Sequence, residues 1–320
     1  MPVVDLPANV RRRPPPLRKR IIQRLGWIGF VGGGALTPRL AGKAAARVWC
    51  KLPANAGRRK DNRPWPGQIS RLRSWLGSDL VVETWEPQPG PDHQDALPDA
   101  ADQAEPKTVL LVHGWGGWRG QVASFVAPLT RAGFKVVAFD ALAHGDSGPG
   151  EQGAAHSSGG ELVRSLENVV GGIGQPYGVI AHSLGCAAVC RAYLDGNLSF
   201  TKLTLVSPSP DMRQVAHTFS RTLGFGRRAE AMLTEEMEKR SHGRLGDFDI
   251  ADMGATGRLP SALVIHDSVD RESPYHVAQD IEARWPGATL VTTEGLGHHR
   301  ILIDPAVVAA AAGNIIGVIG

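Results

Sequence analysis

Residues 177–194 read Tyr-Gly-Val-Ile-Ala-His-Ser-Leu-Gly-Cys-Ala-Ala-Val-Cys-Arg-Ala-Tyr-Leu, and this stretch decides the predicted fold. Its first part, Tyr177–Ala181, is almost continuously apolar, which is typical of a strand buried on both faces. Leu184–Leu194 has the length and composition of a helix. Only His182 and Ser183 separate the two segments, so the chain has to turn sharply there. The stretch therefore predicts a strand, a tight turn that carries a serine, and a helix.

The same alternation continues on both sides of this stretch, from Lys107 to the C-terminus. Further short apolar runs, each expected to be a strand buried on both faces, are Val109–Val112, Val136–Phe139, Leu203–Val206, Ala262–Ile265 and Thr289–Thr292. Helical patterns lie between and after them, at Gln121–Ala132, Ser158–Val170, Pro274–Trp285 and Pro305–Ala312. The alternation predicts the α/β class, with a mostly parallel central sheet and helices on both faces.

The sequence before Lys107 has a different character. Residues 78–86 predict one further strand. Residues 87–106 hold five prolines and five acidic residues, which predict a solvated loop without a core. We expect a basic N-terminal extension at residues 1–77, partly packed on the body, followed by one α/β domain at residues 78–320.

Charge is distributed unevenly along the 320 residues, although the net charge is only +4. Residues 1–80 carry 17 Lys and Arg against three acids, whereas the remainder carries 18 against 28. Hydrophobic residues make up 42% and charged residues 21%, which excludes a disordered chain and a disulfide-rich mini-protein. The three cysteines, Cys50, Cys186 and Cys190, are too few for a disulfide framework and favour a cytoplasmic location.

The basic extension predicts a peripheral role rather than a chemical one. Arg11–Arg13 precede three prolines, and the apolar stretch Leu17–Gly34 follows. We expect this stretch to pack on the body. The alternatives are weak contact with an anionic membrane surface and export. No clear signal-peptide cleavage site follows the stretch, which argues against export. The extension has no recognisable nucleic-acid-reading motif, so no nucleic-acid partner is expected.

Polar residues follow each predicted strand, where the carboxyl ends of parallel strands meet at one edge of a sheet. These segments are His113-Gly114-Trp115 after Val112, Asp140 to Ser147 after Phe139, His182-Ser183 after Ala181, His266 to Asp270 after Ile265, and Gly297-His298-His299 after the last strand. We expect these side chains to lie close together and to form a ligand or active site.

These segments, in this order, resemble the α/β-hydrolase family over about residues 78–320. Ala181-x-Ser183-x-Gly185 is similar to the nucleophile elbow, in which small residues on either side of the serine let strand and helix approach. Ala181 departs from the usual glycine at the first position. His113-Gly114 resembles the oxyanion-loop motif, and Asp140 to Ser147 resembles the loop after the following strand.

The resemblance implies a serine hydrolase that cleaves carboxylic esters or thioesters of a small-molecule substrate. Ser183 would be the nucleophile, His298 its general base and Asp270 the acid that orients the imidazole. The backbone N–H groups of Trp115 and Leu184 would form the oxyanion hole. Such an acyl-enzyme mechanism needs no cofactor and no metal. An acyltransferase, or a non-catalytic binding protein on the same scaffold, remains the alternative.

Each assignment has a rival. Ser183 can be an ordinary helix cap. Asp267 and Asp211 compete with Asp270 for the acid, and His299 competes with His298 for the base. The remaining histidines at these turns are expected to be structural: His113, His144 and His182.

About fifty residues separate Val206 from Arg258, which is too many for a simple turn. Two helical patterns, Asp211–Leu223 and Arg228–Arg240, predict a small helical cap insertion at about residues 208–258. Placed above the carboxyl edge of the sheet, this cap would roof the site. Its Met and Phe residues favour an apolar acyl or alcohol group in the substrate.

Overall fold

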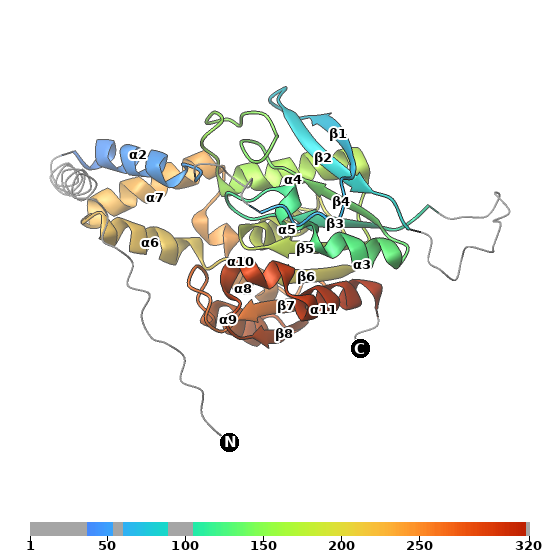
Figure 1. Ribbon diagram of the computed structural model, residues 1–320. Helices are drawn as coiled ribbons and strands as arrows, with labels where there is room; N and C mark the ends of the chain where they lie inside the picture. The colour runs from blue at the N-terminus through green and yellow to red at the C-terminus, as the bar shows by residue number, and fades with distance from the viewer. Residues whose placement is uncertain (1–36, 54–59, 89–104, 318–320) are drawn as a thin grey trace, which may run out of the picture.

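A computed structural model describes residues 37–53, 60–88 and 105–317. Its centre is an eight-stranded sheet in the order β1-β2-β4-β3-β5-β6-β7-β8 (Figure 1). The first two strands pair antiparallel, and β2 is also antiparallel to β4, whereas all other neighbours are parallel. The expected mostly parallel sheet is therefore confirmed. The chain reverses its direction of progress across the sheet between β3 and β5, which is where open α/β sheets bind their ligands.

The strands occupy, in chain order, Gln68–Arg73 (β1), Asp79–Trp85 (β2), Thr108–Val112 (β3), Lys135–Phe139 (β4), Gly178–His182 (β5), Lys202–Val206 (β6), Ala262–Asp267 (β7) and Ala288–Thr293 (β8). The five central strands, β3 to β7, are buried along nearly their whole length. Alternate side chains of these strands enter two separate cores, as the two-residue repeat of a strand requires.

Helices cover both faces of the sheet. One core packs against α4 (Gly159–Ile173), α5 (Leu184–Leu194), α8 (Ile250–Ala255) and α9 (His276–Arg284). The core on the other face packs against α3 (Val126–Arg131) and α11 (Pro305–Ile316). Ser158 caps α4, where its hydroxyl accepts a hydrogen bond from the N–H of Glu161, as expected from the sequence.

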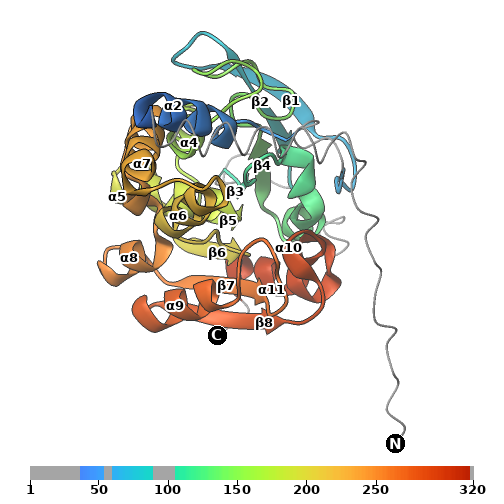
Figure 2. The ribbon, with the colours of Figure 1, turned by 90° about the vertical axis from the view of Figure 1, so that its left-hand side faces the viewer.

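A third, smaller core lies outside the sheet and joins two distant parts of the chain. The cap helices α6 (Met212–Thr222) and α7 (Arg227–Ser241) appear where two helices were expected between β6 and β7. They pack with α2 (Pro38–Trp49), which precedes the whole sheet (Figure 2). Contact is close, because a Cβ atom at Gly42 would lie 2.8 Å from the Cβ of Met232. The N-terminal region thus supplies one helix of the cap.

Two expected elements differ from the structure, and one strand was not expected. Thr289–Thr292 belongs to β8, which is an edge strand with several exposed residues, not a strand buried on both faces. The segment at Gln121–Ala132 begins with the 3₁₀ turns Arg119–Gln121 and Ala123–Phe125, and only Val126–Arg131 is α-helical. Pro128 then lies in the first α-helical turn, where backbone N–H groups have no acceptor within the helix. The lack of an N–H at proline therefore costs no helical hydrogen bond. The short strand β1 was not expected.

The predicted packing or membrane contact of Leu17–Gly34 lies outside the described residues, as does most of the acidic loop at residues 87–106. In the described part of the chain no single helix is long and apolar enough to cross a bilayer. The bent pair Gly297–Ile303 and Pro305–Ile316, at 66°, reaches that length and composition only together. Much of α11 is buried in the core of the domain.

Candidate active site

Ser183 lies at the sharp turn between β5 and α5, where the sequence predicted it. Its backbone has φ 54° and ψ −125°, a conformation that side-chain-bearing residues rarely adopt. Small neighbours make the turn possible: a Cβ at Gly114 would lie 2.7 Å from the Ser183 Cβ. A Cβ at Gly185 would lie 2.5 Å from the carbonyl oxygen of His113. The strained turn holds the serine side chain outward at the carboxyl edge of the sheet.

Three of the expected site residues form one chain of hydrogen bonds. His298 Nε2 lies 3.0 Å from the Ser183 hydroxyl oxygen, and its Nδ1 lies 2.7 Å from Asp270 Oδ2. Both His298 and Asp270 are buried. With Nδ1–H donating to the carboxylate, Nε2 is the unprotonated nitrogen that can accept the serine proton. The arrangement can therefore move a proton away from the hydroxyl as that oxygen attacks an electrophile.

Asp270 is held as a carboxylate. Burial by itself would raise its pKa, but the hydrogen bond with His298 and the N–H groups of Ser273 and Glu272 outweigh burial and lower the pKa to about 2. The two rival acids lie elsewhere. Asp267 accepts hydrogen bonds from Thr293 and from the backbone of Leu296, and Asp211 caps α6 and pairs with Arg213. No hydrogen bond or ion pair joins either rival to His298.

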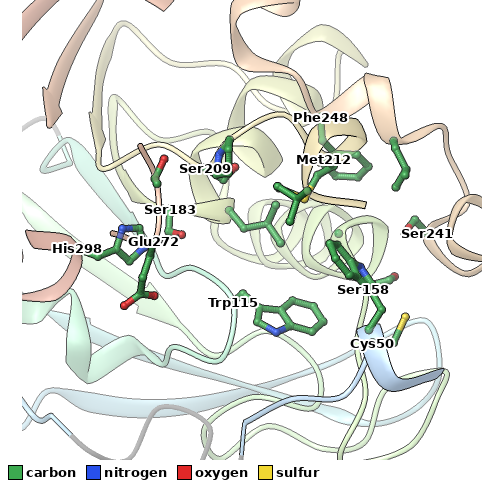
Figure 3. A pocket seen from close by; sticks show the side chains of 17 residues that line it. Cys50, Trp115, Ser158, Ser183, Ser209, Met212, Ser241, Phe248, Glu272 and His298 are labelled. Atoms are coloured by element: carbon green, nitrogen blue, oxygen red, sulfur yellow. Dashed lines mark hydrogen bonds between the residues drawn. The ribbon is translucent and has the colours of Figure 1, made fainter. Parts of the chain in front are cut away.

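His299, the rival base, points to different partners. Its Nδ1 lies 3.2 Å from the Gln121 amide nitrogen, and its Nε2 lies 3.1 Å from a carboxylate oxygen of Glu272. Neither of these two contacts of His299 involves Ser183. Glu272 itself is exposed and lines the site beside His298, so it places a negative charge at the mouth of the site (Figure 3).

The residues expected to supply backbone N–H groups flank Ser183. Trp115 and Leu184 both line the cavity that contains Ser183 and His298. Neither backbone N–H donates to another backbone group in the described residues. Just before Trp115, the buried ring of His113 accepts a hydrogen bond from the N–H of Ala141, 3.1 Å away, and its Nδ1 donates to the Gly114 carbonyl oxygen, 2.8 Å away. His113 thus fixes the loop that carries Trp115 without facing the cavity.

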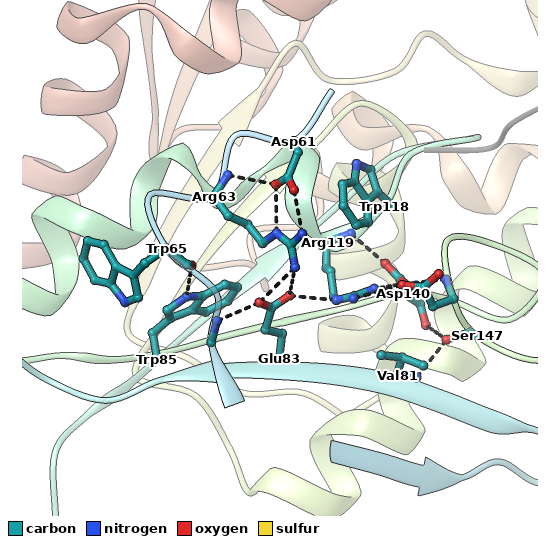
Figure 4. A network of polar contacts seen from close by, with 12 residues as sticks. Asp61, Arg63, Trp65, Val81, Glu83, Trp85, Trp118, Arg119, Asp140 and Ser147 are labelled. Atoms are coloured by element: carbon teal, nitrogen blue, oxygen red, sulfur yellow. Dashed lines mark hydrogen bonds and ion pairs between the residues drawn. The ribbon is translucent and has the colours of Figure 1, made fainter. Parts of the chain in front are cut away.

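A buried ion network anchors the same loop from the other side (Figure 4). Arg119 Nε lies 2.8 Å from Glu83, and its guanidinium also pairs with Asp140 and, at 3.0 Å, with Asp146. The Arg119 N–H donates to Asp140 Oδ1 at 2.7 Å. Burial would lower the pKa of Arg119, but these carboxylates outweigh it and raise the pKa. Because β2, the loop after β3 and the loop after β4 each contribute a charge, the network fixes their relative positions.

A cavity of about 320 Å³ opens beside Ser183 (Figure 3). Ser183 and His298 lie at one end, and the walls between are mainly apolar, formed by side chains such as Trp115, Leu184, Met212 and Phe248. Hydroxyl groups and the thiol of Cys50 line the far end. Residues of the insertion between β6 and β7 line this cavity, and Met212 is one of them. Phe219 instead packs on Trp49, with ring centroids 5.3 Å apart.

Sequence reasoning missed several site residues. Trp49 and Cys50 come from α2, in a region that we expected to be peripheral, and Phe248 comes from a turn after the second cap helix. Nothing local in those stretches marks a cavity wall. A single glutamate, Glu83, directly after the apolar run Leu80–Val82 in β2 is a signal that could have pointed to the ion network. Within the described ranges no group of three His, Cys, Asp or Glu side chains is placed to hold a metal ion.

Comparison with known proteins adds independent information. A model of the Alpha/beta hydrolase family matches residues 109–311, whereas no curated protein matches. Mouse alpha/beta hydrolase domain-containing protein 10 superimposes with a TM-score of 0.56 at 13% identity, over 79% of this chain and 98% of its own. Est1E from Butyrivibrio proteoclasticus, with ferulic acid bound, superimposes with a TM-score of 0.56 at 18% identity. The match covers 77% of this chain and 99% of Est1E. A bacterial membrane phospholipase A superimposes with a TM-score of 0.54 at 17% identity. The match covers 94% of this chain and 99% of the phospholipase. At such identities the structural likeness concerns the fold alone.

Proposed function

The chain belongs to the alpha/beta hydrolase family, and we propose that within it the protein is a serine hydrolase that cleaves carboxylic esters. The observation that carries the proposal is the hydrogen-bonded series from Ser183 through His298 to Asp270 at the end of an apolar cavity. The family match supports hydrolase chemistry in general, as the sequence resemblance implied. The ester substrate and the roles of individual residues are our proposal.

The reaction begins when the Ser183 oxygen attacks the ester carbonyl carbon while His298 Nε2 accepts the hydroxyl proton. Negative charge develops on the carbonyl oxygen, and the N–H groups of Trp115 and Leu184 stabilise it. Loss of one such donor typically costs about 3 kcal/mol of transition-state stabilisation. Asp270 keeps the imidazole in the productive tautomer and stabilises its charged form.

Collapse of the tetrahedral intermediate breaks the bond to the alcohol oxygen, which receives the proton from His298. The acyl group then remains on Ser183 as an ester. A water molecule, deprotonated by the same imidazole, attacks this acyl-enzyme, releases the carboxylic acid and restores the Ser183 hydroxyl. Every proton in the cycle passes through His298, and the chain's own side chains suffice for each step.

The cavity favours an apolar group on the substrate. Trp115, Met212 and Phe248 line the cavity with hydrocarbon and aromatic surface. Glu272, at the mouth, disfavours a negatively charged group close to the scissile bond. We therefore propose neutral esters with an apolar acyl chain as substrates.

The test combines a fluorophosphonate probe with p-nitrophenyl esters of rising chain length. The wild-type protein should react with the probe at Ser183, located by mass spectrometry, and should hydrolyse the esters. Ser183→Ala should lose all labelling and lower kcat by about 10⁴-fold or more. Ser199→Ala, a change at an exposed serine away from the cavity, should leave both unchanged. Equal labelling of wild type and Ser183→Ala would refute the proposal.

A further inference from the structure

Two hollows in the molecule share a wall. The cavity beside Ser183 is bounded at its far end by Phe248 and Ser241. The same two residues line a second hollow, of about 300 Å³, on the outside of the domain. This outer hollow lies among residues of α4, of α5 and of the turn after α7, and its other lining residues are mostly polar. Only the residues around Phe248 and Ser241 therefore separate the apolar cavity from the outer surface at this point.

The wall is packed directly against the start of α4. A Cβ at Gly160 would lie 1.8 Å from the carbonyl oxygen of Ser241, and a Cβ at Gly159 would lie 2.9 Å from Cε1 of Phe248. Phe248 is only 5% exposed and belongs to the core on this face of the sheet. Glycine at both positions lets the backbone of α4 lie directly against the wall that Phe248 and Ser241 form.

Phe248 and Ser241 lie across the cavity from the nucleophile. Figure 3 shows Ser183 and His298 on one side, and Ser241, Ser158 and Cys50 on the opposite side, with Met212 between the two groups and Phe248 nearer to the second group. A linear apolar group attached to the carbonyl that Ser183 attacks would extend along Met212 toward Phe248. The cavity volume of about 320 Å³ lies near the lower limit of about 300–1,000 Å³ for small-ligand sites.

We propose that this cavity binds the saturated acyl chain of the substrate and that the ring of Phe248 sets the maximum chain length. The inference rests on the proposed ester hydrolase function and makes it more specific. Chains that end before Phe248 bury all their methylenes against apolar walls. A longer chain has to displace the ring or leave methylenes in water, so its reaction is slower.

The experiment compares the rates at which a butyl and a dodecyl fluorophosphonate label Ser183. Labelling does not require turnover, and mass spectrometry reports it directly. In the wild-type protein the butyl probe should react faster. Phe248→Ala joins the cavity to the outer hollow, so the ratio of dodecyl to butyl rates should rise about ten-fold, the effect of about two newly buried methylenes.

Two further variants keep the test decisive if Phe248→Ala does not fold. Phe248→Leu removes less packing and should raise the ratio in the same direction. Val215→Phe adds volume from α6, a cap helix that lines the cavity, and should lower the ratio. The matched control is Phe200→Leu, since Phe200 is also buried on this face of the sheet but lines neither hollow; its ratio should equal that of the wild type.

The possible failures are distinguishable. If Ser183 is labelled in the wild type but the ratio is unchanged in Phe248→Ala and Phe248→Leu, the chain-length role of Phe248 is wrong and the hydrolase proposal stands. If no probe labels Ser183 in the folded wild-type protein, the hydrolase proposal fails and this inference fails with it. An equal rise in Phe200→Leu would show a general loosening of the core and would also overturn the inference.

Discussion

His182 contacts the backbone of His298: its Nε2 lies 3.0 Å from the His298 carbonyl oxygen, and the two rings are 4.8 Å apart. Burial and the nearby His298 lower the pKa of His182 well below its ordinary value. The ring is therefore neutral and donates Nε2–H to that carbonyl oxygen. The residue before the proposed nucleophile, at the end of β5, thus holds the backbone of the proposed base in place, although the two lie more than a hundred residues apart in sequence.

This contact predicts a positioning role for His182. His182→Phe keeps an aromatic ring but removes the donor, and a small displacement of His298 should then lower kcat by about 10–100-fold with little change in KM. His182→Gln retains an N–H donor and should recover much of kcat. Steady-state kinetics on a soluble p-nitrophenyl ester measures both constants. A parallel loss in both variants, with KM raised, would argue for a merely structural role.

The assignment of the acid predicts a sharp contrast among three aspartates. Asp270→Asn favours the wrong imidazole tautomer, so kcat should fall by about 10⁴-fold. Asp211→Asn and Asp267→Asn touch groups outside the hydrogen-bonded series and should cost less than about 10-fold. Because the pKa of Asp270 is about 2, its ionisation should produce no inflection in the pH–rate profile above about pH 4. A severe effect of Asp211→Asn would move the acid to the loop after β6.

Buried His113 predicts a pH-dependent stability. Burial lowers its pKa from 6.5 to about 4 in the folded protein. Between these values the unfolded chain binds a proton at His113 that the folded protein does not, so the contribution of His113 to the free energy of unfolding should fall as the pH drops from about 6.5 to 4 and should change little below pH 4. The contribution is of the order of 3 kcal/mol.

Urea unfolding at a series of pH values tests this prediction. His113→Gln keeps an acceptor for the Ala141 N–H and cannot be protonated, so its stability should depend less on pH over the same interval. An identical slope for the variant and the wild type would show that His113 does not contribute.

The ion network predicts that Arg119 is needed for stability. Arg119→Ala leaves the buried carboxylates of Glu83 and Asp140 without their shared cation, which should cost about 3–5 kcal/mol of unfolding free energy. Arg131→Ala, a change at an exposed arginine, should cost less than about 0.5 kcal/mol. Chemical denaturation of both variants measures the difference. Similar stabilities would mean that the network is dispensable.

The N-terminal region should divide into a part without effect on chemistry and a part needed for the cavity. Deletion of residues 1–20 should leave turnover of a short soluble ester within about two-fold of the wild type, because all proposed catalytic groups lie between Trp115 and His298. If the basic stretch binds anionic lipid, the same deletion should abolish salt-sensitive binding to anionic vesicles.

Deletion of residues 1–50 should act differently. It removes α2 and with it the Trp49 and Cys50 side chains that line the cavity, so KM for esters with longer chains should rise. Equal kinetics for the two deletions would show that α2 does not shape the substrate site.

Much of this architecture was predictable because it depends on local patterns. Continuous apolar runs indicated the buried strands. The small residues around Ser183 indicated a tight turn at which a strand and a helix pack closely. The edge position of β8 was not predictable from the sequence. Thr289–Thr292 has the apolar content of a half-buried strand, and its exposure depends on which strand lies next to it.

In the candidate site, too, local patterns were predictable and long-range packing was not. Ser183, Asp270 and His298 each follow a strand, so the rule that sites lie at the carboxyl edge of a parallel sheet brought them together. Trp49 and Phe248 reach the cavity through helix packing between segments far apart in sequence. The sequence of α2 gave no sign of its partner, because its buried residues are small.

The packing of α2 on α7 has a consequence for the order of events during synthesis. The apolar face of α2, with Ala41, Ala45 and Ala46, is translated before any strand of the sheet, whereas its partner surface on α7, with Ala229 and Leu233, emerges only after six of the eight strands. Until then that face has no native surface to cover it and is available to chaperones or to other nascent chains. Closure of the cavity is therefore a late step, and a ribosome-bound chain that ends before residue 227 can contain at most six of the eight strands, with this face of α2 still uncovered.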